Sequence, residues 1–188
     1  MWQTLFPDTL RHAELALSAL VLACSIGAPF GLLAASRGWA RSPILAAAAL
    51  GRTLPSIAVL ALLVPLLGVG APPAIAALTL LALPPIVFNV DLAVRSAPAA
   101  ALDVATGLGM TARQRFVRVV VPFALPTALA GVRTASIEVI GSAALATFVG
   151  AGGLGDDIVR GLQTADSALL IAASILVAAL AFLAGIRS

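Results

Sequence analysis

The uncharged segment from Thr53 to Val90 constrains this chain more than any other feature of its sequence. It is too long and too apolar for the core of a soluble domain, since about 20 apolar residues already let a helix cross a bilayer. The composition agrees, because 61% of the 188 residues are hydrophobic and only 10% are charged. The mean hydropathy is +1.12. We therefore expect an all-α integral membrane protein with one transmembrane domain over residues 1–188.

Five apolar segments are long enough to be membrane spans, and each is expected to be a helix. They are Leu15–Ala35, Pro43–Leu67, Ala71–Val90, Phe123–Val149 and Ser167–Ile186. The sequence GVGAPP at 68–73 divides the long uncharged run into the second and third spans, because glycine and proline interrupt helices. Prolines inside the spans, such as Pro55 and Pro84, are expected to kink them.

The arginines predict the orientation of these spans. With five spans, the connections at 36–42 and 91–122 lie on the same side as the C-terminal tail. That side carries Arg37, Arg41, Arg95, Arg113, Arg115, Arg118 and Arg187, whereas the other side carries Arg11 and Arg160. By the positive-inside rule, the N-terminus is expected outside, and the C-terminus and the 91–122 loop are expected in the cytoplasm.

Three charged residues fall inside the expected spans, namely Arg52, Arg133 and Glu138. A charge at that depth needs a partner or a wet cavity. One interpretation is structural, with Arg52 paired to Glu138 or with arginines that extend toward the inner surface. The other interpretation is that these residues line a translocation path.

Signals for an enzyme are weak. GAGGLG at 150–155 matches a dinucleotide-binding pattern, but no strand is expected before it, so it is interpreted as a close-packed turn. The chain has no Lys for a phosphate-binding loop, only one His and only one Cys. The motif VLAC, which ends at Cys24, resembles a lipid-attachment box, but the apolar run continues to Ala35 and favours a retained span. No basic and aromatic patch indicates nucleic acid, no metal site is expected, and no cofactor is expected in this chain.

The segment LDVATGLGMTARQRFVRVVVP at 102–122 concentrates charge in an otherwise apolar chain. We expect a short helix capped by Ser96 with Pro98 in its first turn, a bend at Gly107 and Gly109, and a second helix that runs to Pro122. Thr111 and Gln114 have the spacing of a capping box at the start of that second helix. Such a segment fits either an interfacial helix on anionic lipid or a surface that docks on a partner.

The same segment resembles the cytoplasmic loop of ABC importer permeases. Their pattern is Glu-Ala-Ala, three residues, Gly, nine residues, Ile, one residue, Leu and Pro. This chain keeps that spacing with Asp103-Val104-Ala105, Gly109, Val119 and Val121-Pro122. A second block, FVGAGGLGDDIVRGL at 148–162, is similar to the subfamily that imports osmoprotectants such as glycine betaine, choline or carnitine. Glu138 departs from the small or apolar residue expected there.

The resemblance implies a five-helix permease of type I importers, similar to the methionine permeases, in the inner membrane of a prokaryote. It implies a coupling helix that sits in a groove of an ABC ATPase subunit, which would supply ATP and Mg²⁺ chemistry. The residues implied in coupling are Asp103, Ala105, Gly107, Gly109, Arg113, Arg115 and Pro122. A second permease subunit, an external substrate-binding protein and membrane lipid are the other implied partners. The alternatives are a permease for another small polar solute such as methionine, or a membrane assembly subunit that does not transport.

Overall fold

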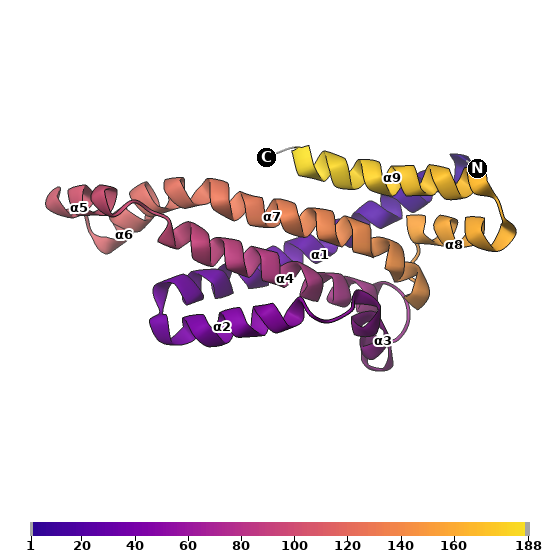
Figure 1. Cartoon of the computed structure of the whole chain (residues 1–188), viewed down its shortest axis with the longest axis horizontal. Helices are drawn as coiled ribbons and strands as arrows, with labels where there is room; N and C mark the ends of the chain where they lie inside the picture. Colours follow the sequence, from indigo (N-terminus) through magenta and orange to yellow (C-terminus); the bar gives the residue numbers. More distant parts are fainter. Residues whose placement is uncertain (1, 187–188) are drawn as a thin grey trace.

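The structure is a computed structural model that describes the backbone of residues 2–186 and the side chains of residues 5–186. Within this part every regular element is helical, and the molecule is an elongated bundle (Figure 1). The α-helices are α1 Trp2–Ser36, α2 Gly38–Gly51, α3 Ser56–Leu67, α4 Ala71–Arg95, α5 Ala99–Gly107, α6 Ala112–Arg115, α7 Val121–Ala143, α8 Leu154–Thr164 and α9 Ser167–Ile186. A π-helix, η1 (Phe116–Val120), joins α6 to α7, and a 3₁₀-helix, η2 (Ala144–Val149), follows α7. Arg187, which entered the orientation argument, lies outside the described residues.

The core of the bundle is formed by α1, α4 and α7, which run along the long axis of the molecule (Figure 1). Small residues let these helices approach closely. A Cβ atom added to Gly31 of α1 would lie 2.7 Å from Cβ of Val90, and one added to Gly131 of α7 would lie 2.5 Å from Cβ of Asn89. Lipid offers apolar side chains no hydrophobic gain on association, so close packing of small residues is the main attraction between such helices.

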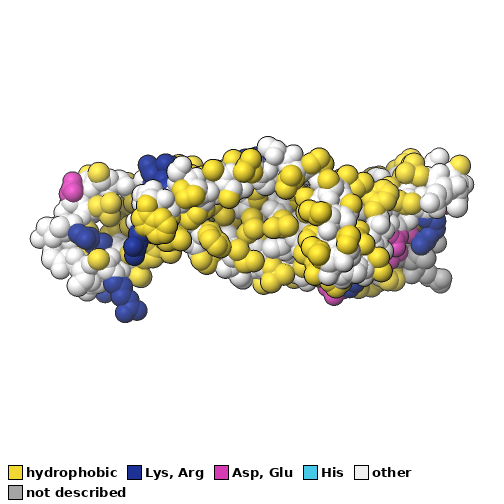
Figure 2. All heavy atoms as spheres, turned by 90° about the horizontal axis from the view of Figure 1, so that it is seen from below, with side chains coloured by type: hydrophobic (Ala, Val, Ile, Leu, Met, Phe, Trp, Pro, Cys, Tyr) yellow, Lys and Arg dark blue, Asp and Glu magenta, His cyan; other side chains and the backbone are white. Residues whose placement is uncertain are grey.

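Four helical stretches are long and apolar enough to cross a membrane: Leu5–Ser36, Ala71–Arg95, Ala112–Val149 and Ser167–Ile186. A fifth span exists only if α2 and α3 are counted together, because they meet at an angle of 97°. Figure 2 shows hydrophobic side chains over the middle of the molecule, with most of the visible charged side chains toward its two ends. The expected multi-pass membrane protein is thus confirmed.

The span expected over Pro43–Leu67 is broken into α2 and α3 rather than only kinked at Pro55. The helix stops after Gly51, and the chain resumes as a helix only after Pro55, whose backbone is extended at φ −61° and ψ 129°. Proline has no N–H to donate and disfavours helical geometry in the residue before it, here Leu54. The expected kink is therefore a sharp bend. The expected break at 68–73 is confirmed, since Gly68 and Gly70 adopt positive φ values of 79° and 105°.

Candidate functional site

The hairpin segment, residues 99–120, lies at one end of the bundle, far from α8 and the start of α9 (Figure 1). Its turn is built around Gly109, which has φ +72°. The N–H of Gly109 donates to the carbonyl of Thr106, and the N–H of Met110 donates to the carbonyl of Ala105. These are the two bonds of a Schellman motif, in which a left-handed glycine ends a helix. The expected reversal at this glycine is confirmed.

The second helix of the hairpin segment begins with the expected capping box. Gln114 Oε1 accepts from the N–H of Thr111 at 2.8 Å, and Thr111 Oγ1 accepts from the N–H of Gln114 at 3.3 Å. Arg115 then reaches back across the turn, and its Nη1 donates to Thr106 Oγ1 at 2.7 Å. The turn, the cap and this bond fix α5 relative to α6 through contacts inside the segment.

Two details of this region were expected incorrectly. Ser96 does not cap α5; it ends α4 and donates from Oγ to the carbonyl of Ala93, while Pro98 takes the position before α5. The second helix also does not stop at Pro122. It continues through the π-helix into α7, because the missing N–H of a proline costs little in the first turn of a helix and α7 starts at Val121. The interfacial helix considered from sequence is therefore the first part of a spanning helix.

The surface of α5 is unusually apolar for a segment beyond the spans. Val104 is 64% exposed and Leu108 is 71% exposed, and Asp103 beside them is exposed as well. Ala105 is the buried residue of α5. Gly107 lies at the end of α5 with open space around its Cα. Arg113 is exposed on α6. The segment thus presents a preformed surface with one acidic side chain and two large apolar ones.

An ion pair that the sequence reasoning missed lies between α2 and the end of α4. Arg41 Nε lies 3.1 Å from Asp91 Oδ1, and Arg41 Nη2 lies 3.1 Å from Oδ2, so the contact is bidentate. The Asp91 side chain is only 5% exposed. The one signal for this pair was an acid immediately after a long uncharged run, which does not reveal its partner. The pair fastens the bent α2–α3 unit to α4.

The structure separates the three intramembrane charges. Arg52 is exposed at the break after α2, Arg133 is exposed on α7, and Glu138 is half-buried on α7. Within residues 5–186 the ion pairs are Arg11–Glu14, Arg41–Asp91 and Arg160–Asp157, so the expected Arg52–Glu138 pair is not formed there. The bend after Gly51 explains this, because it leaves Arg52 at the exposed break. Arg133 lines a hollow of about 330 Å³ with Leu125, Pro126, Leu129 and Ala130.

The glycine turn at 150–153 begins a region with very close backbone contacts, which we call the glycine junction. It consists of η2, this turn, α8 and the residues of α1 that they contact. A Cβ atom on Gly155 would lie 2.1 Å from the carbonyl oxygen of Ala144, and one on Gly153 would lie 3.3 Å from the backbone of His12. The turn connects helices rather than a strand and a helix. Its interpretation as a close-packed turn is confirmed.

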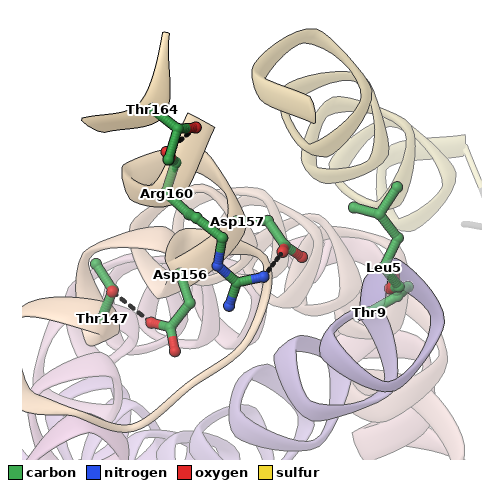
Figure 3. Close-up of polar contacts among 7 residues, drawn as sticks. All are labelled: Leu5, Thr9, Thr147, Asp156, Asp157, Arg160 and Thr164. Atoms are coloured by element: carbon green, nitrogen blue, oxygen red, sulfur yellow. Dashed lines mark hydrogen bonds and ion pairs between the residues drawn. The ribbon is translucent and has the colours of Figure 1, made fainter. Parts of the chain in front are cut away.

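Polar contacts join the parts of the glycine junction, and Figure 3 shows those of Thr147 with Asp156 and of Arg160 with Asp157. Arg11 Nε donates to the carbonyl of Ala151 at 3.1 Å, and His12 Nε2 lies 2.9 Å from the carbonyl oxygen of Ile140. Thr147 Oγ1 donates to Asp156 Oδ1. Asp157, which is completely buried, accepts from Arg160 Nη1 at 3.2 Å. The sequence reasoning did not single out Asp157, because its burial depends on helix packing far along the chain.

Comparison with known proteins gives a consistent result. Residues 27–186 match the sequence family described as the binding-protein-dependent transport system inner membrane component. The osmoprotectant import permease protein OsmW of Salmonella typhimurium is 40% identical over 92% of this chain and 83% of its own length. The carnitine transport permease protein OpuCB of Listeria monocytogenes is 36% identical over 94% of this chain and 81% of its own. The choline transport system permease protein OpuBB of Bacillus subtilis is 36% identical over 92% and 80%.

Solved structures resemble the fold. An inward-facing structure of the MetNI methionine ABC transporter has a TM-score of 0.85 at 23% identity and covers 98% of this chain and 92% of the matched chain. A crystal structure of an amino acid ABC transporter with histidines has a TM-score of 0.76 at 16% identity, over 98% and 88%. The five-helix type I importer arrangement expected from the resemblance is thereby confirmed.

Proposed function

The chain belongs to the family of binding-protein-dependent transport system inner membrane components, and from this premise we propose that it is the permease subunit of an ABC importer for osmoprotectants. Permease function is established by the family and by the relatives of 36–40% identity, and the fold agrees with it. The solute class is the proposal. One observation carries it: relatives at 35–40% identity over most of this chain are named for osmoprotectants, carnitine, choline and glycine betaine.

These solutes share a quaternary ammonium group. A permanent cation of this kind cannot cross hydrocarbon unaided, because a charge in the bilayer centre is costly. Methionine is the weaker candidate, since the methionine transporter resembles this chain at 23% identity, which speaks for the fold alone. Selection of the solute is assigned to an external binding protein.

We propose that the hairpin segment docks on a separate ATPase subunit. The exposed Val104 and Leu108 beside Asp103 support this, because an apolar patch next to a charge outside the spans is typical of a contact surface. The chain has no Lys, so it has no phosphate-binding loop of the usual kind. ATP and Mg²⁺ therefore belong to the partner in this proposal. Membrane lipid remains the alternative contact for the exposed arginines of α6 and η1.

The exposed face of α7 is assigned to the translocation path, between this chain and a second permease subunit. Arg133 is exposed and Glu138 is half-buried at membrane depth, and neither forms an ion pair within residues 5–186. Intramembrane charges in that situation usually face a wet cavity or a partner. Glu138→Gln is expected to lower solute uptake while the protein still assembles. Unchanged uptake would remove Glu138 from the path.

The decisive experiment is uptake by the full chain co-expressed with its ATPase and binding protein. Radiolabelled glycine betaine, choline and carnitine are compared with methionine under energised and ATP-depleted conditions. We expect ATP-dependent uptake of at least one quaternary ammonium solute and none of methionine. Methionine uptake alone would replace the solute class. An assembly subunit without transport would support no uptake of any of the four.

Orientation is tested separately by cysteine labelling. In a Cys24→Ser background, single cysteines replace Ala112 or Gln163, which lie at opposite ends of the molecule and are exposed. We expect a membrane-impermeant reagent to label the second from outside and the first only after the membrane is opened. Labelling of both from one side would reject the proposed topology.

A further inference from the structure

The glycine junction contains a buried carboxyl group that is incompletely bonded. Asp157 lies in the first turn of α8 and has no exposed surface. Its Oδ1 accepts from Arg160. Its Oδ2 is buried and has no hydrogen-bond partner in the described chain when the Asp157 carboxyl group is taken as ionised. Leaving a buried polar atom unbonded is costly, so an unsatisfied carboxylate oxygen calls for an explanation.

A second carboxyl group from another helix supplies that explanation. Asp8 of α1 is half-buried one helix turn after Leu5, which packs against Leu154 of α8. This places the Asp8 carboxyl group on the part of α1 that meets α8, where its charge raises the pKa of Asp157. Figure 3 shows Asp157 on the side of α8 next to α1, where Leu5 and Thr9 are drawn. Ionised carboxylates are acceptors only, so two of them form a hydrogen bond only when one carries a proton. That proton would also turn Oδ2 from an unsatisfied acceptor into a donor.

We propose that the buried Asp157 and the half-buried Asp8 form one proton-binding site, in which the protonated Asp157 donates from Oδ2 to the Asp8 carboxylate and fastens α8 to the first turns of α1. The ligand of this site is a single proton. When it leaves, two like charges face each other, one of them on the fully buried Asp157, and the attachment of α8 weakens.

The neighbouring charges favour one retained proton. On α1, Arg11 is engaged by Glu14 at 2.8 Å and by a backbone carbonyl, and His12 bonds to the carbonyl of Ile140. On α8, Asp156 accepts from Thr147, and Arg160 is the cation bonded to Asp157. The sequences of η2 and α9 contribute no charged residue. One cation therefore faces the carboxyl groups of Asp8 and Asp157, and Asp156 adds a further negative charge that raises the pKa of Asp157. A retained proton reduces this excess of negative charge.

The direction of the Asp157 pKa agrees with this arrangement. Burial raises its pKa, and the Asp8 carboxylate and the hydrogen bond with it raise it further, while Arg160 acts in the opposite direction. The folded state consequently holds the proton more tightly than the unfolded chain does. Stability is therefore complete below the ordinary carboxyl pKa of about 4 and is lost as pH rises from there through the raised pKa.

Thermal unfolding of the full chain in detergent tests the proposal. The midpoint temperature of the wild type is expected to fall by about 3 °C or more between about pH 5 and about pH 8. Asp157→Asn keeps a donor toward Asp8 and cannot ionise, so its midpoint should stay constant over that interval. Asp103→Asn makes the same charge change on an exposed residue of α5 and should retain the wild-type slope.

The opposite outcome would identify Asp157 as an ionised partner of Arg160. In that case Asp157→Asn would lose as much stability as Asp157→Ala and would keep the wild-type slope. Infrared spectroscopy provides a second measurement that does not require any variant to fold. Wild-type protein labelled with ¹³C-aspartate should still show the band of a protonated carboxyl group at about pH 5, above the ordinary carboxyl pKa of about 4, and its absence would overturn the proposal. Neither measurement depends on the transported solute.

Discussion

The hairpin segment and the glycine junction are both built from short helices and glycine turns, but they are completed differently. In the hairpin segment the hydrogen bonds are local, such as Arg115 to Thr106, and large apolar side chains remain exposed. In the glycine junction the bonds include one between residues far apart in sequence, Arg11 and Ala151, and Asp157 is completely buried.

The difference shows which end of the molecule buries its contacts within the chain and which end leaves a surface exposed for a partner. The glycine junction satisfies its packing internally, so changes there should act on folding. The hairpin segment is ordered by its own bonds but leaves a surface for another molecule, so changes there should act on assembly. Each of the following predictions tests this division.

The largest effect is expected from adding one methyl group inside the glycine junction. In Gly155→Ala the new Cβ would lie 2.1 Å from a backbone oxygen of Ala144, which cannot move without shifting η2. We expect the free energy of unfolding to fall by about 3 kcal/mol or more, because overpacking against backbone forces helices apart. Thermal unfolding in detergent measures the loss.

Gly107→Ala is the matched control in the hairpin segment. Nothing lies within 4 Å of the added Cβ, and its φ is not positive. Alanine is the better helix former, so stability should stay constant or rise by up to about 1 kcal/mol. Equal losses in the two variants would contradict the proposed division.

A smaller but specific effect is expected for Asp103→Arg. The residue is exposed on α5, so the thermal midpoint of the chain alone should not change. Reversing a charge at a docking surface costs binding energy, and we expect the affinity for the ATPase subunit to fall at least about tenfold. Co-purification and a binding titration measure this. Asp103→Glu, which keeps the charge, should bind the ATPase subunit with normal affinity. An equal loss of affinity in Asp103→Glu would show that the charge of this residue does not determine binding.

The smallest effect is expected for Arg115→Gln. It removes the bond to Thr106, which is worth about 1 kcal/mol at most on an accessible surface. Amide hydrogen exchange in α5 should become faster, and less solute should be moved per ATP, while global stability is kept. Arg113→Gln removes an exposed arginine of the same helix and is the control for charge. Identical exchange in both variants would show that Arg115 does not position α5.

The structure of the hairpin segment could be predicted from sequence because its signals are local. The glycine turn needs only a left-handed residue, and the capping box needs only Thr111 and Gln114 at the right spacing, so both were predicted correctly. The role of Ser96 was not, because α4 extends further than its apolar run, to Arg95, and uses that serine as its C-cap. The apolar pattern alone does not mark where a helix leaves the membrane.

Long-range packing explains the other differences. The pairing of Arg41 with Asp91 and the burial of Asp157 depend on how helices meet, which no spacing in the sequence reveals. The bend between α2 and α3 also required the structure, since a proline in a span permits anything from a slight kink to a right angle. Arg52 was placed in a continuous helix for that reason, and its expected pairing with Glu138 followed from that placement.

The continuity of the helix from Ala112 to Val149 has a mechanical consequence. At about 1.5 Å per residue, 38 residues form a rod of roughly 57 Å, which joins the hairpin segment directly to the glycine junction. A helix resists compression along its axis, so a push on the hairpin segment reaches the far end of the bundle without passing through side-chain contacts. The π-helix at Phe116–Val120 is the compliant element of this rod, since such turns interrupt the regular hydrogen-bond ladder. On one side of this π-helix lies a short arm, which consists of the four residues of α6, the turn and α5. On the other side lies a long arm, which is the whole spanning helix.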